Sequence, residues 1–144
     1  MRFHTDVALI FRALQGRQKE FNWLIADVEC NIYPPEFPDD LENKPSWFTG
    51  EQITEIVEKQ DIQFIWAVLL GFRPEVKIDI SNLEVVPCAK EHPTLWQEHP
   101  VIQHPQATVE IVCYDSSYTI LLSKDNDLSQ KFRSFFPEAK DLDE

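Results

Sequence analysis

The sequence predicts a single α+β domain, with a mostly antiparallel or mixed sheet of about five strands and three helices. Its 144 residues suit one domain, and 43% of them are hydrophobic, which is enough apolar material for a core. Segments of helical and of alternating periodicity are both present, but they lack the regular strand–helix order of a doubly wound sheet. We therefore expect one domain over residues 1–144, with an acidic, flexible tail from about residue 138.

Apolar residues at helical spacing predict three helices: residues 6–15, residues 50–59, and a segment from Asp125 or Asp127 to Pro137. Thr5 is the expected N-cap of the first helix and Gly16 its stop. Thr49-Gly50-Glu51-Gln52 has the spacing of a capping box, in which the first and last side chains bond reciprocally to the backbone. These signals fix both ends of the first helix and the start of the second.

Strands are expected at residues 21–33, 62–71, 107–115 and 118–124, with one or two short strands at 78–80 and 83–85. The segment 62–71 is apolar on both faces, which predicts the central strand. The last two long strands are expected to form a hairpin. Alternating apolar residues of the first strand should share one face: Leu24, Ala26, Val28, Cys30 and Ile32. Prolines between residues 34 and 45 are expected to keep that segment out of helix and sheet.

The charge balance excludes several classes of partner. The chain has 25 acidic and 13 basic residues and a formal net charge of −12, whereas nucleic-acid binding requires a basic face. The same balance argues against docking on an anionic membrane. Three glycines are too few for the phosphate-binding loops of dinucleotide or Walker type.

The sequence also predicts a cytoplasmic protein. Asp6 and Arg12 interrupt the N-terminal apolar stretch, which is not typical of a signal peptide. The longest apolar run, Phe64–Phe72, has about half the length that a membrane span needs. An odd number of widely spaced cysteines (Cys30, Cys88 and Cys113) fits reduced thiols rather than a disulfide framework.

The segment Glu20–Asn43 is the most informative for function. It contains seven acidic residues and no lysine or arginine, with aromatic residues interleaved. Like charges at this density repel, and beside exposed rings they form a surface suited to a basic partner. The predicted contact residues are Asp27, Glu29, Tyr33, Glu36, Phe37, Asp39, Asp40, Glu42 and Trp47. The alternative is a solvated acidic loop whose aromatic rings turn inward to the core.

Other chemistry-bearing residues give weaker patterns. Asp27 and Glu29 lie two apart on a strand, so their carboxylates share a face and can hold a divalent metal or divide acid and base roles. His92, His99 and His104 are spaced more widely than zinc ligand pairs usually are, and each precedes proline. We predict no catalytic residue, no bound metal and no cofactor.

Three segments resemble small uncharacterised bacterial proteins, some of them grouped with immunity proteins of polymorphic toxin systems: Phe21–Glu29, Ile62–Phe72, and Val109–Ser117 with the closing Phe136–Leu142. The resemblance implies a cytoplasmic, non-enzymatic protein that binds one cognate toxin and blocks it. It carries no catalytic residues that could be transferred to this chain.

The leading hypothesis is therefore a protein-binding domain, an immunity-like inhibitor of a basic toxin or other basic protein. A second hypothesis is a metal-assisted hydrolase or small-molecule-binding domain that uses Asp27, Glu29 and the loop histidines. A third is a structural or housekeeping domain whose acidic residues only maintain solubility.

Overall fold

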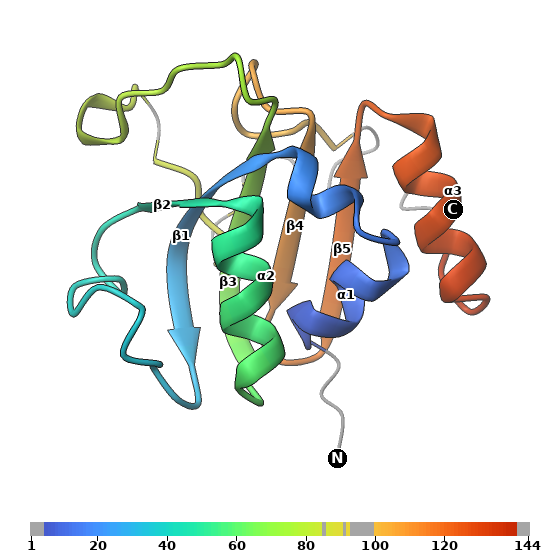
Figure 1. Ribbon diagram of the computed structural model, residues 1–144, viewed down its shortest axis with the longest axis horizontal. Coiled ribbons are helices and arrows are strands. Elements are labelled where there is room, and N and C mark those ends of the chain that lie inside the picture. The colour runs from blue at the N-terminus through green and yellow to red at the C-terminus, as the bar shows by residue number, and fades with distance from the viewer. Residues whose placement is uncertain (1–4, 85, 91, 93–99, 141–144) are drawn as a thin grey trace.

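A five-stranded antiparallel sheet in the order β2-β1-β3-β4-β5 forms the centre of the structure, which is a computed structural model (Figure 1). It describes residues 5–84, 86–90, 92 and 100–140. The strands within these residues are β1 (Asn22–Cys30), β2 (Ser46–Thr49), β3 (Phe64–Phe72), β4 (Val109–Tyr114) and β5 (Tyr118–Ser123). The helices are α1 (Val7–Ala13), α2 (Gly50–Lys59) and α3 (Asn126–Phe135), with short 3₁₀ helices η1 (Arg17–Glu20) and η2 (Ile80–Asn82). The predicted α+β class is confirmed.

The sheet separates two hydrophobic clusters. Helices α1 and α2 cover one face (Figure 1), where Trp23 and Leu69 are fully buried. On the other face, Leu24 and Leu70 pack against the long connection between β3 and β4, which contributes Ala89 among other residues. The described part of this connection is thus the main cover of the second face.

Among the described helices, none combines the length and apolar character needed to cross a membrane.

The helix ends follow the sequence signals except at both ends of α1. This helix ends at Ala13 with Leu14 as its C-cap, and Gly16, the predicted stop, is the N-cap of η1. The capping box of α2 forms, because Gln52 N–H donates to Thr49 Oγ1 at 3.1 Å and Thr49 N–H donates to Gln52 Oε1 at 2.9 Å. The N-cap of α1 is Asp6, not the predicted Thr5. Asp6 lies one residue later, and its carboxylate accepts from the N–H groups of Ala8 and Leu9.

A β-bulge in β1 overturns the predicted face of that strand. Ala26 pairs with Val68 and Glu29 with Trp66, so Asp27 and Val28 together lie opposite one residue of β3. The extra residue reverses the alternation beyond this point. As a result Leu24 belongs to the second cluster, whereas the later apolar residues of the strand, Val28 and Cys30, belong to the first.

Two further strand predictions differ from the structure. The short edge strand β2 was not predicted, although Trp47 and Phe48 are typical strand residues. The expected short strands at 78–80 and 83–85 do not form in the described residues, where Ile80–Asn82 is a 3₁₀ helix and residue 85 lies outside the description. The central position of β3 and the β4–β5 hairpin are confirmed.

An ion-pair network attaches α3 to η1. Arg17 donates to both carboxylate oxygens of Glu20, to Asp125 at 3.0 Å and to Asp127 at 3.0 Å. Asp125 is also the N-cap of α3. Hydrogen bonding from Arg17 holds the pKa of Asp125 below its ordinary value. One guanidinium thus joins two segments more than 100 residues apart.

Replacing Arg17 with glutamine should raise the pKa of Asp125 and lower the free energy of unfolding at neutral pH by about 1 kcal/mol or more. Because the folded-state pKa of Asp125 is depressed, the ion pair with Arg17 stabilises the fold. This stabilisation is complete above the unfolded pKa of about 4 and is lost as pH falls through the folded pKa. Carboxyl NMR titration and urea denaturation at several pH values measure both effects. Arg12→Gln, which removes an exposed pair with Glu58, should leave the Asp125 pKa unchanged.

Gly50 lies where a side chain has no room. A Cβ at this position would be 2.5 Å from the carbonyl oxygen of Gln18 and 2.7 Å from that of Phe21, and both are backbone atoms that cannot rotate away. Gly50→Ala should therefore lower the free energy of unfolding by about 1–3 kcal/mol, measured by urea denaturation. The neighbouring exposed change Glu51→Ala should stay within about 0.5 kcal/mol. Equal effects of the two changes would contradict the close approach of α2 and η1.

Candidate functional site

Five of the predicted contact residues are carboxylates that the structure exposes to solvent. We call them the acidic surface: Glu29, Glu36, Asp39, Asp40 and Glu42. All except Glu29 lie in the connection between β1 and β2, which runs beside the sheet (Figure 1). Glu29 and Glu42 are both close enough to Cys30 to contribute to its raised thiol pKa of about 11, whose main cause is burial. The structure therefore brings the end of β1 and the following loop together.

Positive charges near the acidic surface are exposed and weakly held. Lys44 lies 3.6 Å from Asp40, and both side chains are more than half exposed. Lys59 pairs with Glu55 at 2.9 Å, and Glu36 also contributes to the raised pKa of Lys59. Exposed pairs of this kind contribute about 0–1 kcal/mol and are screened by salt. The acidic surface thus keeps most of its negative potential.

Three of the four aromatic residues between Glu20 and Asn43 do not share this exposure, namely Phe21, Trp23 and Phe37. Phe37 is only 5% exposed, and its ring packs 5.8 Å from that of Phe48 and 6.4 Å from that of Phe64. The predicted role of Phe37 as a contact residue is therefore corrected, since its ring anchors the loop to the core. Phe21 and Trp23 are buried as well. For these rings the alternative reading, in which they turn inward, describes the structure.

Trp47 and Tyr33 occupy intermediate positions. Trp47 is half-buried, and its ring centroid lies 5.5 Å from that of Phe72. It belongs to the second hydrophobic cluster, whereas Phe37 belongs to the cluster on the opposite face of the sheet. Tyr33 is 39% exposed, and its hydroxyl oxygen accepts from the N–H of Cys30 at 3.2 Å. Burial, together with Glu42, raises the Tyr33 pKa to about 12. Of the predicted aromatic contacts, Tyr33 presents the most accessible ring beside the acidic surface.

Asp27 has a structural task that the sequence did not reveal. It has a positive φ of 52° in the bulge of β1, a conformation that Asp tolerates better than most residues. Its Oδ2 accepts from the N–H groups of Ala89 at 2.8 Å and Lys90 at 3.1 Å. Asp27 thus attaches the β3–β4 connection to β1, whereas Glu29 remains exposed. Among the described residues, no group of three or more His, Cys, Asp or Glu side chains can hold a metal ion.

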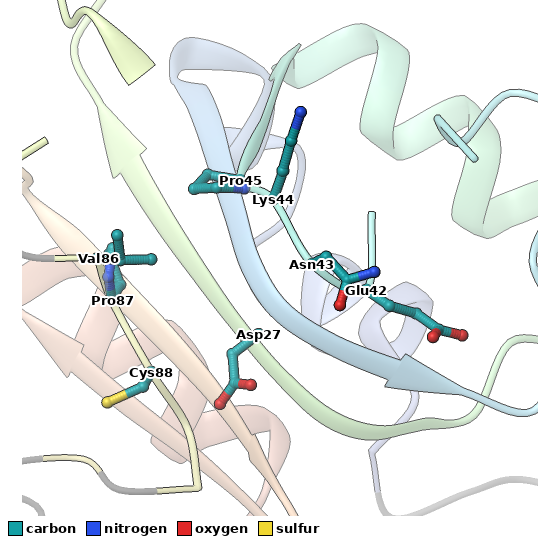
Figure 2. Close-up of a pocket in the computed structure, with 8 residues that line it drawn as sticks. All are labelled: Asp27, Glu42, Asn43, Lys44, Pro45, Val86, Pro87 and Cys88. Atoms are coloured by element: carbon teal, nitrogen blue, oxygen red, sulfur yellow. The ribbon is translucent and has the colours of Figure 1, made fainter. Parts of the chain in front are cut away.

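A pocket of about 240 Å³ opens beside Asp27. Its lining residues are Asp27, Glu42, Asn43, Lys44, Pro45, Val86, Pro87 and Cys88. Figure 2 shows the Asp27 carboxylate between the two lining segments, while the carboxylate of Glu42 and the ammonium of Lys44 point away from it. The pocket thus joins the edge of the acidic surface to the β3–β4 connection.

The loop histidines have separate environments. His92 Nε2 lies 2.7 Å from Glu110 Oε2, and the two side chains are 1% and 0% exposed. His104 packs edge-on against Phe72 at 5.1 Å, and burial lowers its pKa. His99 lies outside the described residues, so of the three loop histidines only His92 and His104 are placed.

Glu110 is the central residue of a polar network that the sequence analysis missed. It lies in β4, and its Oε1 accepts from the N–H of Gln103 at 2.8 Å. Its Oε2 accepts from Gln103 Nε2 at 3.0 Å and contacts His92. Gln103 also exchanges two bonds with the backbone of Cys88, at 2.9 and 3.0 Å. A glutamate within the apolar run of a central strand was the available signal, because a buried carboxylate requires donors.

These buried groups are poorly placed for chemistry on a substrate. The His92 and Glu110 side chains are almost completely enclosed, so a substrate cannot reach them without displacing the connection. Burial raises the pKa of the thiols of Cys30 and Cys113, which disfavours the nucleophilic thiolate. The network is therefore read as a structural attachment of the connection to the sheet.

Comparisons with protein-family models, with curated proteins and with solved structures found no match.

Replacing Glu110 with alanine should lower the free energy of unfolding by about 3–5 kcal/mol, because it leaves buried donors of His92 and Gln103 without an acceptor. Chemical denaturation measures this loss. The control is Glu29→Ala, which removes an exposed carboxylate in β1. It should change the free energy of unfolding by no more than about 0.5 kcal/mol. A loss below about 1 kcal/mol for Glu110→Ala would contradict the importance of the network.

Proposed function

We propose that this domain binds a basic protein partner through its acidic surface and performs no chemistry of its own. The observation that carries the proposal is the exposure of five carboxylates between residues 29 and 42, in a chain of net charge −12. The paired cations Lys44 and Lys59 are themselves exposed. These carboxylates repel one another, which costs stability. A use of their negative potential in binding would explain why they lie together.

Such a surface acts first on the rate of association. Uncompensated charge of one sign attracts an oppositely charged partner over about 8–10 Å at physiological salt and raises the association rate. Ile32 and Tyr33 are 41% and 39% exposed and lie next to these carboxylates in the chain. Their apolar area supplies short-range contacts that slow dissociation.

The partner class that best fits this surface is a basic toxin, with the domain acting as an immunity-like inhibitor. Toxins that attack nucleic acid need a basic face for phosphate, and an acidic protein can occupy that face in its place. The resemblance of three segments to immunity proteins supports the same class. Cytoplasmic location belongs to this proposal, because an odd number of widely spaced cysteines fits a reducing compartment better than a disulfide framework.

The metal-assisted hydrolase has less support from the geometry. Asp27 is bonded to the backbone of Ala89 and Lys90, and His92 is enclosed with Glu110. A catalytic pair that uses Asp27 and His92 would require both attachments to open. The hypotheses of a small-molecule-binding domain and of a housekeeping domain would be favoured if the experiment below captures no basic protein.

The test is charge reversal of the acidic surface. The triple variant Asp39→Lys, Asp40→Lys and Glu42→Lys should weaken capture of a basic partner at least tenfold at low salt and flatten its salt dependence, because the steering charge is removed. The immobilised domain captures proteins from native lysate, a salt gradient elutes them, and mass spectrometry identifies them. The affinity of the purified partner is then measured against each variant.

The matched control reverses three exposed carboxylates elsewhere, Glu51, Glu75 and Glu138, with the same change in net charge. It should reduce binding much less than the surface variant does. An equal loss of affinity in both variants would show that binding depends on the overall net charge and not on the acidic surface. Unchanged affinity in the surface variant, or no captured basic protein, would refute the proposal and favour the housekeeping reading.

A further inference from the structure

We propose that the pocket beside Asp27 receives one arginine or lysine side chain of the basic partner. This inference rests on the proposed function and assigns an anchoring position next to the acidic surface. The pocket lies between residues 42–45 of the β1–β2 connection and residues 86–88 of the β3–β4 connection. Asp27, in the bulge of β1, lines the pocket together with these two segments.

The lining has the chemistry that a long cationic side chain requires. Val86, Pro87 and Pro45 supply apolar surface on opposite sides of the pocket (Figure 2). Arginine and lysine bury their methylene stems along such surface while the charged end reaches a polar group. The Asp27 carboxylate lies between the two sides, where that charged end would arrive.

Asp27 retains acceptor capacity for this contact. Both backbone N–H groups that it accepts are bonded to Oδ2, and a carboxylate offers about four lone-pair positions over its two oxygens. None of the ion pairs between described residues involves Asp27. Lys44 lines the same pocket, but its ammonium pairs with Asp40 and points away from Asp27.

The size of the pocket is compatible with one long side chain. Its volume of about 240 Å³ is below the roughly 300–1,000 Å³ typical of sites for drug-sized ligands. The charge of Asp27 then favours a cationic side chain over an apolar one, because an apolar occupant would leave the carboxylate desolvated.

The experiment titrates the full chain with N-acetylarginine amide and records backbone amide shifts by NMR. N-acetylcitrulline amide, a neutral molecule of nearly the same shape, is the matched control ligand. We expect shifts centred on the amides of Asp27, Asn43 and Cys88 with the arginine probe, and at least tenfold weaker binding of the citrulline probe. A general attraction to negative charge would instead spread the shifts over residues 36–42.

Three variants make the assignment specific. Asp27→Asn keeps an acceptor for the loop amides but removes the charge, and should weaken arginine binding at least tenfold. Glu75→Gln removes one charge at an exposed carboxylate that does not line the pocket, so binding should change less than twofold. Val86→Trp, at an exposed position, should block the pocket without touching Asp27. This variant keeps the test valid if Asp27→Asn disturbs the loop.

The outcomes separate this inference from the proposed function. If the basic partner still depends on Asp39, Asp40 and Glu42 while the arginine probe shows no localised shifts, the pocket assignment is wrong and the binding function stands. Equal weakening by Asp27→Asn and Glu75→Gln would also overturn the assignment. Localised shifts that persist in Val86→Trp would place the cation elsewhere and refute it.

Discussion

The bulge at Asp27 is the constraint on which the arrangement of this molecule depends. One additional residue in β1 transfers Val28 and Cys30 to the helix-covered face, where they complete the cluster formed by α1 and α2. The same residue directs the Asp27 carboxylate toward the connection between β3 and β4. Without the bulge, Val28 would lie on the opposite face and the carboxylate would lose its contact with that connection. A local change in strand register thus determines both the core and the edge where the pocket forms.

Two groups of acidic residues, one bonded to the β3–β4 connection and one in the acidic surface, have different physical roles. Asp27 and Glu110 accept hydrogen bonds from the β3–β4 connection and attach it to the second face of the sheet. The hydrogen-bond donors around each carboxylate offset the cost of removing it from water. The carboxylates of the acidic surface lie in solvent, where their charge acts over a distance. Net charge alone could not distinguish these groups, because the difference lies in the donors that the fold supplies.

The sequence was informative where local chemistry determines structure. The capping box at Thr49, the hairpin before α3 and the apolar run of β3 each contain their own signal, and each is confirmed. The bulge could not be predicted, because the alternating pattern from Leu24 to Cys30 is complete without it. The role of Glu110 depends on His92 and Gln103, which lie in a different segment. The burial of Phe37 depends on Phe48 and Phe64 in the same way. Contacts between distant segments of the chain determine these features, and local sequence patterns do not show such contacts.

Among the described residues, the distribution of titratable groups supports the proposed binding role more than a catalytic one. Catalytic residues need a reactive form and access to a substrate at the same position. Here, enclosed Glu110 is bonded to His92 and Gln103, and burial makes the thiols of Cys30 and Cys113 harder to ionise. The carboxylates of the acidic surface are exposed to water. Such groups are suited to attracting and orienting a large, oppositely charged partner. Among the described residues, the enclosed His92–Glu110 pair and the exposed acidic surface are thus separate groups, and this separation is compatible with the binding role proposed above.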